Sequence, residues 1–290
     1  MTTHLNNTMR LFFIVGAQKS GSTWLQQSLN GMDGVHCLGE GHFIDRLVNP
    51  IAETTGSYNE MMQLVAERVY EGNGFYDAVP NAELRLVMRE WILHILLRNA
   101  KVDRNNILAI GDKTPAHSFG LPTLRALFPE ARFVHMLRDG RDAAVSAFHH
   151  QQRILSKLGQ ANPEASLEKD APAWLSKWAR FTRAVQKAEQ GGIRIHTVRY
   201  EAMLADPNKA LRDCLEHIAP DTIWPETDIQ KNVEANSFRR QSGREPGQSS
   251  NSSFLRKGQA GSWREELSPT ALSRLDPADQ ELLEQLGYNG

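Results

Sequence analysis

A lysine and a row of hydroxyl side chains lie between glycines near the start of the chain. The segment GAQKSGSTW, residues 16–24, contains Lys19 together with Ser20, Ser22 and Thr23. A lysine supplies positive charge, and hydroxyls and backbone N–H groups supply hydrogen-bond donors, which together suit a phosphate-like anion. The segment therefore predicts an anion-binding loop.

The flanking residues predict the elements that position this loop. Five apolar residues, 11–15, run without a break into Gly16, which is typical of a buried parallel strand. After Gly21, Trp24, Leu25 and Leu29 fall on one face of an amphipathic helix. The loop then joins a strand end to a helix N-terminus, where backbone N–H groups converge.

The glycine spacing resembles the Walker loop GxxxxGK[ST], but the lysine is displaced. Gly16 and Gly21 keep the spacing, whereas Ser22 occupies the lysine position and the lysine stands at Lys19. An ATP or GTP site would need that lysine on its phosphates and a hydroxyl on Mg²⁺. The alternative interpretation is a tight turn that binds no ligand.

Composition limits the function classes. The chain has 290 residues, a formal net charge of −1 and two cysteines, Cys37 and Cys214, without metal-ligand spacing. We therefore expect no nucleic-acid partner, no metal and a reduced, cytoplasmic protein. No run approaches the ~20 apolar residues of a membrane span. The oligomeric state stays open.

Alternating strands and helices predict the fold class. Apolar runs at 107–110, 132–137 and 193–198 predict three further strands, 33–43 a loop, and 44–105 helices. The apolar stripe Met61, Met62, Val65 and Val69 is expected to be core. We expect α/β architecture: one domain over residues 1–290, with a central parallel sheet flanked by helices.

Two later segments are predicted from their composition. Residues 151–190 indicate a polar linker followed by a helix with Trp174, Trp178 and Phe181 on one face. Residues 237–257 are rich in Ser, Gly, Asn and Arg, which predicts a mobile loop that closes over a ligand. Trp263 is the expected anchor beyond it.

Polar side chains follow the predicted strands, at the sheet edge where ligands bind in open α/β folds. Asp112, Lys113 and His117 follow the second strand, and Arg138 and Ser146 follow the third. A second basic pair, Arg256 and Lys257, stands beside Gly258. Two separate anion sites suggest a ligand with two phosphate groups.

Four motifs, in order, resemble those of the PAPS-dependent sulfotransferases, where PAPS is 3′-phosphoadenosine 5′-phosphosulfate. KSGSTW resembles their 5′-phosphosulfate loop, RDGRDAAVSAFHH their 3′-phosphate motif, and FLRKGQAGSW their C-terminal RKGxxGxWK signature, with Arg264 in place of the last lysine. Tyr200 in RYEAMLADP matches a tyrosine that contacts the adenine. The resemblance implies a P-loop NTPase-like fold.

The resemblance also implies the cofactor site. Lys19 would contact the oxygen that bridges phosphate and sulfonate, and Trp24 would either face the adenine or belong to the core. The remaining residues expected to bind PAPS, or its product PAP, are Gln18, Ser20, Gly21, Ser22, Thr23, Arg138, Ser146, Tyr200, Arg256, Lys257 and Gly258.

The resemblance further assigns a general base. CLGEGHF and GDKTP are closer to the branch that modifies carbohydrates and protein tyrosines, in which a glutamate after the first helix is the base. Glu40 matches that glutamate, His117 is its rival, and His42 is a weaker rival. Lys113 would meet the sulfonate oxygens.

The sequence thus predicts transfer of a sulfonate from PAPS to a hydroxyl of a carbohydrate, lipid or secondary metabolite. Such an in-line displacement needs alignment and charge stabilisation, which Lys19 and Lys113 can supply without a metal. The alternatives are a P-loop kinase acting on a small molecule and a PAP-binding module that has lost catalysis.

Overall fold

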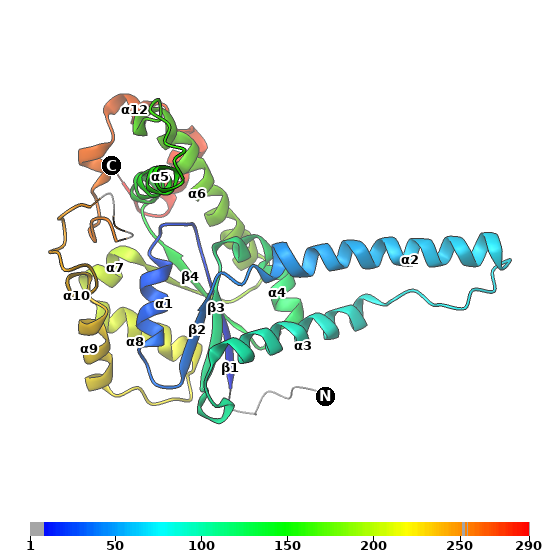
Figure 1. The fold of residues 1–290 in the computed structure, drawn as a ribbon. Helices are drawn as coiled ribbons and strands as arrows, with labels where there is room; N and C mark the ends of the chain where they lie inside the picture. Colours follow the sequence, from blue (N-terminus) through cyan, green and yellow to red (C-terminus); the bar gives the residue numbers. More distant parts are fainter. Residues whose placement is uncertain (1–8, 251–252, 254, 290) are drawn as a thin grey trace.

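A five-stranded parallel sheet forms the centre of the protein (Figure 1). The structure is a computed structural model that describes residues 9–250, 253 and 255–289. The strand order is β2-β3-β1-β4-β5, and each neighbouring pair is parallel. This confirms the predicted α/β class. The strands are β1 (Arg10–Val15), β2 (Val35–Gly39), β3 (Ala109–Lys113), β4 (Arg132–Leu137) and β5 (Ile195–Arg199).

Helices cover both faces and one end of this sheet. Two short 3₁₀ segments, Arg104–Asn106 and Pro115–Gly120, and a π-helical segment, Phe43–Val48, connect elements. The α-helices are α1 (Ser22–Asn30), α2 (Asn49–Val69), α3 (Asn81–Ala100), α4 (Leu121–Leu127), α5 (Gly140–Lys157), α6 (Leu167–Gln190), α7 (Tyr200–Ala205), α8 (Pro207–Ile218), α9 (Glu226–Ala235), α10 (Phe238–Ser242), α11 (Trp263–Glu266), α12 (Pro269–Ser273) and α13 (Pro277–Gln285).

Strand β1 is central because both of its faces are apolar. Leu11, Phe13 and Val15 belong to the core shared with α3 and α4, while Phe12 and Ile14 belong to the core shared with α1 and α8. Successive side chains of a strand point to opposite faces, so an unbroken apolar run fits a strand that is covered on both sides. The end of β1 is thereby fixed, and the anion loop starts there.

Strand β2 lies at residues for which the sequence predicts a loop, so that prediction is wrong. Val35–Gly39 pairs with β3 at the sheet edge, and Cys37 lies opposite Gly111. Val35 and Cys37 are buried, whereas His36 between them is partly exposed. Five residues flanked by glycines carry too weak a pattern to predict a strand. Pairing with β3 supplies the order.

Strand β3 begins and ends later than predicted. It runs to Lys113, and Gly111, Asp112 and Lys113 are fully enclosed between β1 and β2. A Cβ at Gly111 would lie 2.4 Å from the carbonyl oxygen of Phe12, so glycine permits the close approach. Asp112 and Lys113 are therefore held in place at the carboxyl end of β3, between two neighbouring strands.

Two helices depart from the predictions. Helix α2 contains no buried residue, and Met61 is 53% and Val69 63% exposed, so the expectation that this stripe is core is wrong. Figure 1 shows α2 projecting away from the sheet. Helix α5 continues to Lys157, although the sequence predicts a polar linker from residue 151; the buried residues of α5 end at Phe148, so its last turns extend the packed part of the helix.

Among the described residues, the structure contains no helix of the length and apolarity needed to cross a bilayer.

Candidate active site

The anion loop turns tightly between β1 and α1. Gly16 and Gly21 have φ of +132° and +102°. A Cβ would lie 2.4 Å from the carbonyl oxygen of Met136 at the first and 2.6 Å from the Tyr200 ring at the second. Only glycine fits both positions. Lys19, with φ of +68°, stands between them at the crest of the loop.

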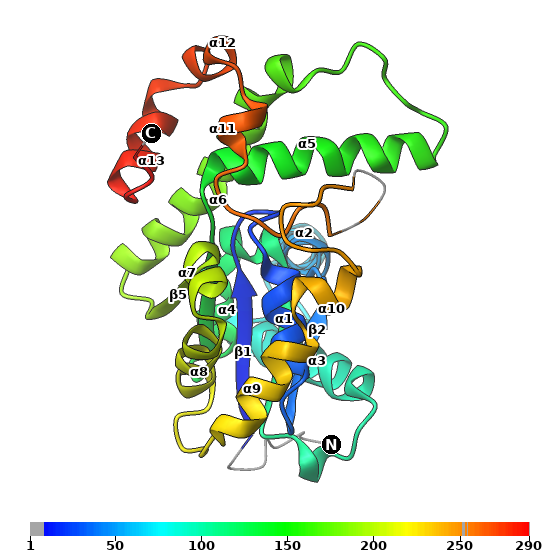
Figure 2. The ribbon, with the colours of Figure 1, turned by 90° about the vertical axis from the view of Figure 1, so that its left-hand side faces the viewer.

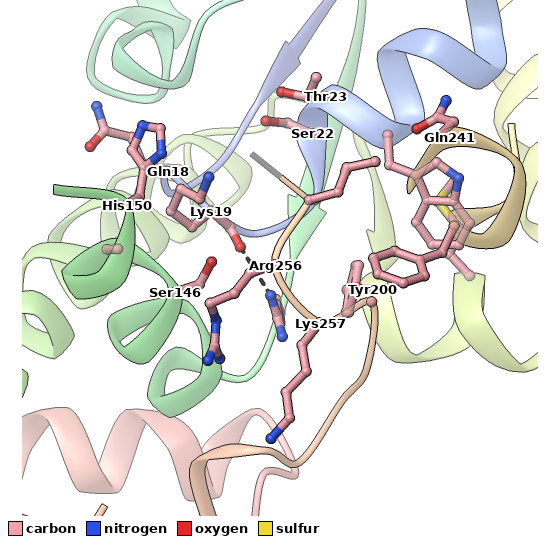
Figure 3. A pocket seen from close by; sticks show the side chains of 18 of the residues that line it. Gln18, Lys19, Ser22, Thr23, Ser146, His150, Tyr200, Gln241, Arg256 and Lys257 are labelled. Atoms are coloured by element: carbon pink, nitrogen blue, oxygen red, sulfur yellow. Dashed lines mark hydrogen bonds between the residues drawn. The ribbon is translucent and has the colours of Figure 1, made fainter. Parts of the chain in front are cut away.

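A cavity of about 700 Å³ opens above this loop and gathers most of the predicted residues (Figure 3). Helix α5 lies across the same end of the sheet, and the described part of the segment between α10 and α11 passes beside it (Figure 2). The predicted site residues that line the cavity are Gln18, Lys19, Gly21, Ser22, Thr23, Trp24, Glu40, Lys113, Arg138, Ser146, Tyr200, Arg256, Lys257 and Gly258.

His117 is placed outside the cavity lining, in the core. It is fully buried, and its Nε2 accepts a hydrogen bond of 3.1 Å from the Phe43 N–H. Burial lowers the pKa of His117 to about 4. Its Nδ1 lies 3.5 Å from Oδ1 of Asp112. This placement suits a residue that supports the loop carrying Glu40.

Glu40 is held at the mouth of the cavity by Lys113. The Nζ of buried Lys113 donates to Glu40 Oε1 at 2.8 Å, and the Glu40 side chain is 57% exposed. The backbone N–H of Glu40 donates to the Lys113 carbonyl at 2.9 Å. Asp112 holds the next residue, because its Oδ2 accepts the Gly41 N–H at 3.0 Å. Glu40 and Lys113, which the sequence predicts separately as site residues, are thus in direct contact.

His42 lies beside this pair, but its shorter contact is with Asp45. Its Nδ1 is 3.0 Å from Oδ2 of Asp45, and its Nε2 is 4.0 Å from Oε2 of Glu40. The π-helical segment that follows fixes Asp45.

Arg138 connects the loop to the C-terminal segment. It donates to the carbonyl of Lys19 at 3.3 Å and to that of Gln259 at 3.0 Å. Its guanidinium lies 4.3 Å from the centre of the Tyr200 ring. Tyr200 packs edge-to-face with Trp24, whose Nε1 donates to the Asn236 carbonyl at 3.1 Å. Trp24 is therefore both a packing residue and part of the cavity wall.

Cations concentrate around Lys19. Burial, as the largest cause, and the charges of Arg153, Arg138, Lys113 and Arg256, in that order, together lower the pKa of Lys19 to about 8. A protein with net charge −1 thus holds a locally positive site. An anion bound in the cavity would relieve this repulsion.

The C-terminal basic pair is engaged with carboxylates. Arg256 makes two bonds of 2.9 Å to Glu266, and Lys257 makes one of 2.8 Å to Glu265. His149 also contacts Glu266, at 2.9 Å. Burial acts to raise the pKa of Glu266, but the bonds from His149 and Arg256 outweigh it and lower this pKa to about 2.

Asp142 ties the signature segment to α5. Its carboxylate accepts bonds from the backbone N–H groups of Gly261, at 2.6 Å, and Trp263, at 3.0 Å. Trp263 is buried, which confirms its predicted role as an anchor.

The segment 237–257 is partly outside the described residues, at 251–252 and 254. Its described part contains α10 and a loop held by Arg244, which donates to the carbonyls of Leu255 and Arg256. Gly258, with φ of +60°, packs against Phe238 of α10. Whether the segment moves stays a prediction.

Sequence reasoning missed the cavity residues that follow Ser146 on α5. His150 and Ile154 lie one and two helical turns beyond it and line the cavity. The spacing of four residues was the available signal. Arg153 was not predicted, because its effect depends on the tertiary structure, which places it close enough to Lys19 to lower the pKa of Lys19.

The fold and the site define a P-loop-like α/β protein with a lysine at the crest of its anion loop. The chain belongs to the Sulfotransferase family, whose model matches residues 12–225.

Sequence relatives include two groups of named enzymes. The chain is 28% identical over 218 residues to protein-tyrosine sulfotransferase 1 of Danio rerio, covering 73% of this chain and 54% of that protein. It is 25% identical over 108 residues to the omega-hydroxy-beta-dihydromenaquinone-9 sulfotransferase Stf3 of Mycobacterium bovis, covering 37% and 27%. The chain spans about half the length of the tyrosine sulfotransferases that it matches.

Solved structures share the fold. The sulfotransferase domain of the Synechococcus PCC 7002 olefin synthase aligns with a TM-score of 0.56 and 20% identity, covering 100% of this chain and 98% of that domain. Mouse sulfotransferase SULT7A1, complexed with PAP, aligns with a TM-score of 0.53 and 13% identity, covering 96% and 82%.

Proposed function

We propose that this protein transfers the sulfonate of PAPS to a hydroxyl of an acceptor and releases PAP. One observation carries the proposal: a single cavity gathers Lys19, the cations Arg138 and Arg256, and the Glu40–Lys113 pair. The relatives' names support the reaction class, since they describe sulfotransferases of protein tyrosine and of a hydroxylated menaquinone. A PAP complex in a protein of the same fold supports the nucleotide.

The residues present fit a ligand with two anionic ends. The Nε atoms of Arg138 and Arg256 and the Oγ of Ser20 are buried, with no hydrogen-bond partner among the described residues. Buried polar groups are usually paired, so these atoms await a ligand or water. Arg138, Ser146, Arg256, Lys257 and Gly258 would hold the 3′-phosphate, and Ser20 to Thr23 the 5′-phosphate.

When bound, PAPS would supply a sulfonate, whose bond to a phosphate oxygen would break as the acceptor oxygen bonds to sulfur. Lys19 would stabilise the charge that develops on the phosphate, and Lys113 the sulfonate oxygens. Glu40 would take the acceptor proton. Its contact with Lys113 orients that carboxylate at the mouth of the cavity, as a base requires.

The acceptor approaches over an apolar wall. Ile154, Leu155 and Trp174 line the cavity together with the polar residues of the loop. We propose that the acceptor is a hydroxylated carbohydrate, lipid or secondary metabolite. An acceptor screen decides among these three classes.

The test is transfer of label from [³⁵S]PAPS to a panel of sugars, lipids, phenols and hydroxylated metabolites, with and without EDTA. We expect labelled product with at least one acceptor, and no loss on chelation, because Lys19 and Lys113 supply the charge that Mg²⁺ supplies in kinases. Transfer of phosphate from ATP that EDTA abolishes and Mg²⁺ restores would instead establish the kinase. PAP binding without turnover on any acceptor would favour the inactive module.

A further inference from the structure

Helix α5 brings a histidine to the cavity wall beyond the predicted nucleotide residues, and an arginine of the same helix contacts this histidine. His150 lies one turn after Ser146 and lines the cavity. Figure 3 shows its ring beside Gln18 and Lys19. Arg153 lies behind it on the same helix, with its Nη2 3.0 Å from Nδ1 of His150. Neither residue has a part in the function proposed above.

The contact with Arg153 determines the tautomer of His150. A guanidinium has only N–H donors, so Nδ1 of His150 must be the acceptor. A neutral imidazole that accepts at Nδ1 carries its proton on Nε2. The ring therefore presents an N–H donor and has no lone pair left for base catalysis.

The surroundings keep this ring neutral. Burial, as the largest cause, and the charges of Lys19 and Arg153 together lower the pKa of His150 to about 4, while Glu40 acts in the opposite direction. These are the charged groups that face it from the anion loop, from its own helix and from the β2 end. A donation from a cation to Nδ1 also polarises the ring and strengthens the Nε2–H donor.

We propose that His150 donates its Nε2–H to an oxygen of the sulfonate during transfer, and that Arg153 is the positioning residue that fixes its tautomer. The inference rests on the proposed function, because it assigns a role within that reaction. His150 lies among Lys19, Glu40 and Arg153, where the reacting group belongs if Lys19 and Glu40 act as proposed. A neutral donor there adds a hydrogen bond without adding to the crowded positive charge.

The first experiment reads the tautomer directly, without turnover. In protein labelled with ¹⁵N-histidine, we expect His150 to show a protonated Nε2 and an unprotonated Nδ1 from pH 6 to pH 8. Arg153→Met should give mixed tautomers, and Arg153→Lys should restore the wild-type pattern. A protonated Nδ1 in the wild type, or an unchanged pattern in Arg153→Met, would overturn the inference.

The second experiment separates a donor from a base. Removing one preorganised donor typically costs about 10²–10³ in kcat, and we expect such a loss in His150→Ala. His150→Gln places an amide N–H near the former Nε2 position and should recover to within about tenfold of wild type. Equal losses in the two variants would contradict the donor role, as would full activity in His150→Ala.

A matched control and a binding measurement complete the design. Lys157→Ala removes a positive charge from the exposed end of the same helix and should leave kcat unchanged. All variants should keep the PAP affinity within about threefold, because PAP lacks the sulfonate. Failure of the wild-type protein to bind PAP would contradict the proposed function. PAP binding and turnover in the wild type, with a kcat that does not change when His150 is replaced, would contradict this inference alone.

Discussion

At the scale of single residues, Glu40 carries the most specific prediction. Glu40→Gln keeps the size and the hydrogen bond from Lys113 but removes the proton acceptor. We expect kcat to fall by about 10²–10⁴, while the PAP affinity measured by calorimetry changes less than about twofold. His117→Ala serves as comparison, because its ring lies outside the cavity and its loss should lower stability more than kcat. Full activity in Glu40→Gln together with a collapse of kcat in His117→Ala would transfer the role to the histidine.

Lys19 should give PAP binding a pH dependence. Burial and the neighbouring cations lower the pKa of Lys19 from 10.5 to about 8, so the ammonium of the free site is half deprotonated at about pH 8 and mostly deprotonated above it. A bound anion favours the ammonium and raises the pKa, so binding takes up protons between these values and the affinity falls as the pH rises. Calorimetry in buffers of different ionisation enthalpy should show about one proton taken up near pH 9 and none near pH 6.5. The same uptake in Lys19→Met would contradict this assignment.

At the scale of elements, the segment 237–257 is predicted to close over the nucleotide, and residues 237–250 are the longest part of it that the structure describes. Arg244 donates to the carbonyl of Arg256, and the Gly247 N–H donates to the carbonyl of Lys257. Because of these bonds, a movement of residues 237–250 would also move the basic pair. Hydrogen exchange at 237–250 should slow when PAP binds. The segment is too polar to be ordered by its own burial, and closure over the ligand would protect its backbone N–H groups from solvent. Arg244→Ala should weaken both the protection and PAP affinity, and exchange at α8 serves as the internal control. Exchange at 237–250 that PAP leaves unchanged would count against closure.

The elements also show what sequence can and cannot predict. Strand β1, the anion loop and β4 were predictable because long apolar runs end at glycines or charged turns. Strand β2 was not, since pairing with β3 rather than its own five residues orders it. The contact between Arg256 and Glu266 and the position of Arg153 depend on helix packing. Sequence spacing therefore predicted site residues that mostly line the cavity, but it did not predict the partners of their charges.

At the scale of the whole molecule, charge is local rather than global. The net charge of −1 gives no long-range field for an anion, yet the cavity gathers Lys19, Lys113, Arg138, Arg256 and Lys257. Glu265 and Glu266 balance the last two in the structure. Selectivity should therefore come from the spacing of the two anion sites and not from overall attraction of anions.

The comparison of PAP with ATP in thermal unfolding tests the central claim most directly. Both ligands carry adenine and a 5′-phosphate, but only PAP has the 3′-phosphate for which Arg138, Ser146 and Arg256 are proposed. At about 100 times its dissociation constant, a ligand that binds only the native state adds about 2.7 kcal/mol to the free energy of unfolding. We predict a large rise in Tm with PAP, a much smaller rise with ATP at the same concentration, and loss of the difference in Arg138→Met. Equal shifts from PAP and ATP would contradict the account.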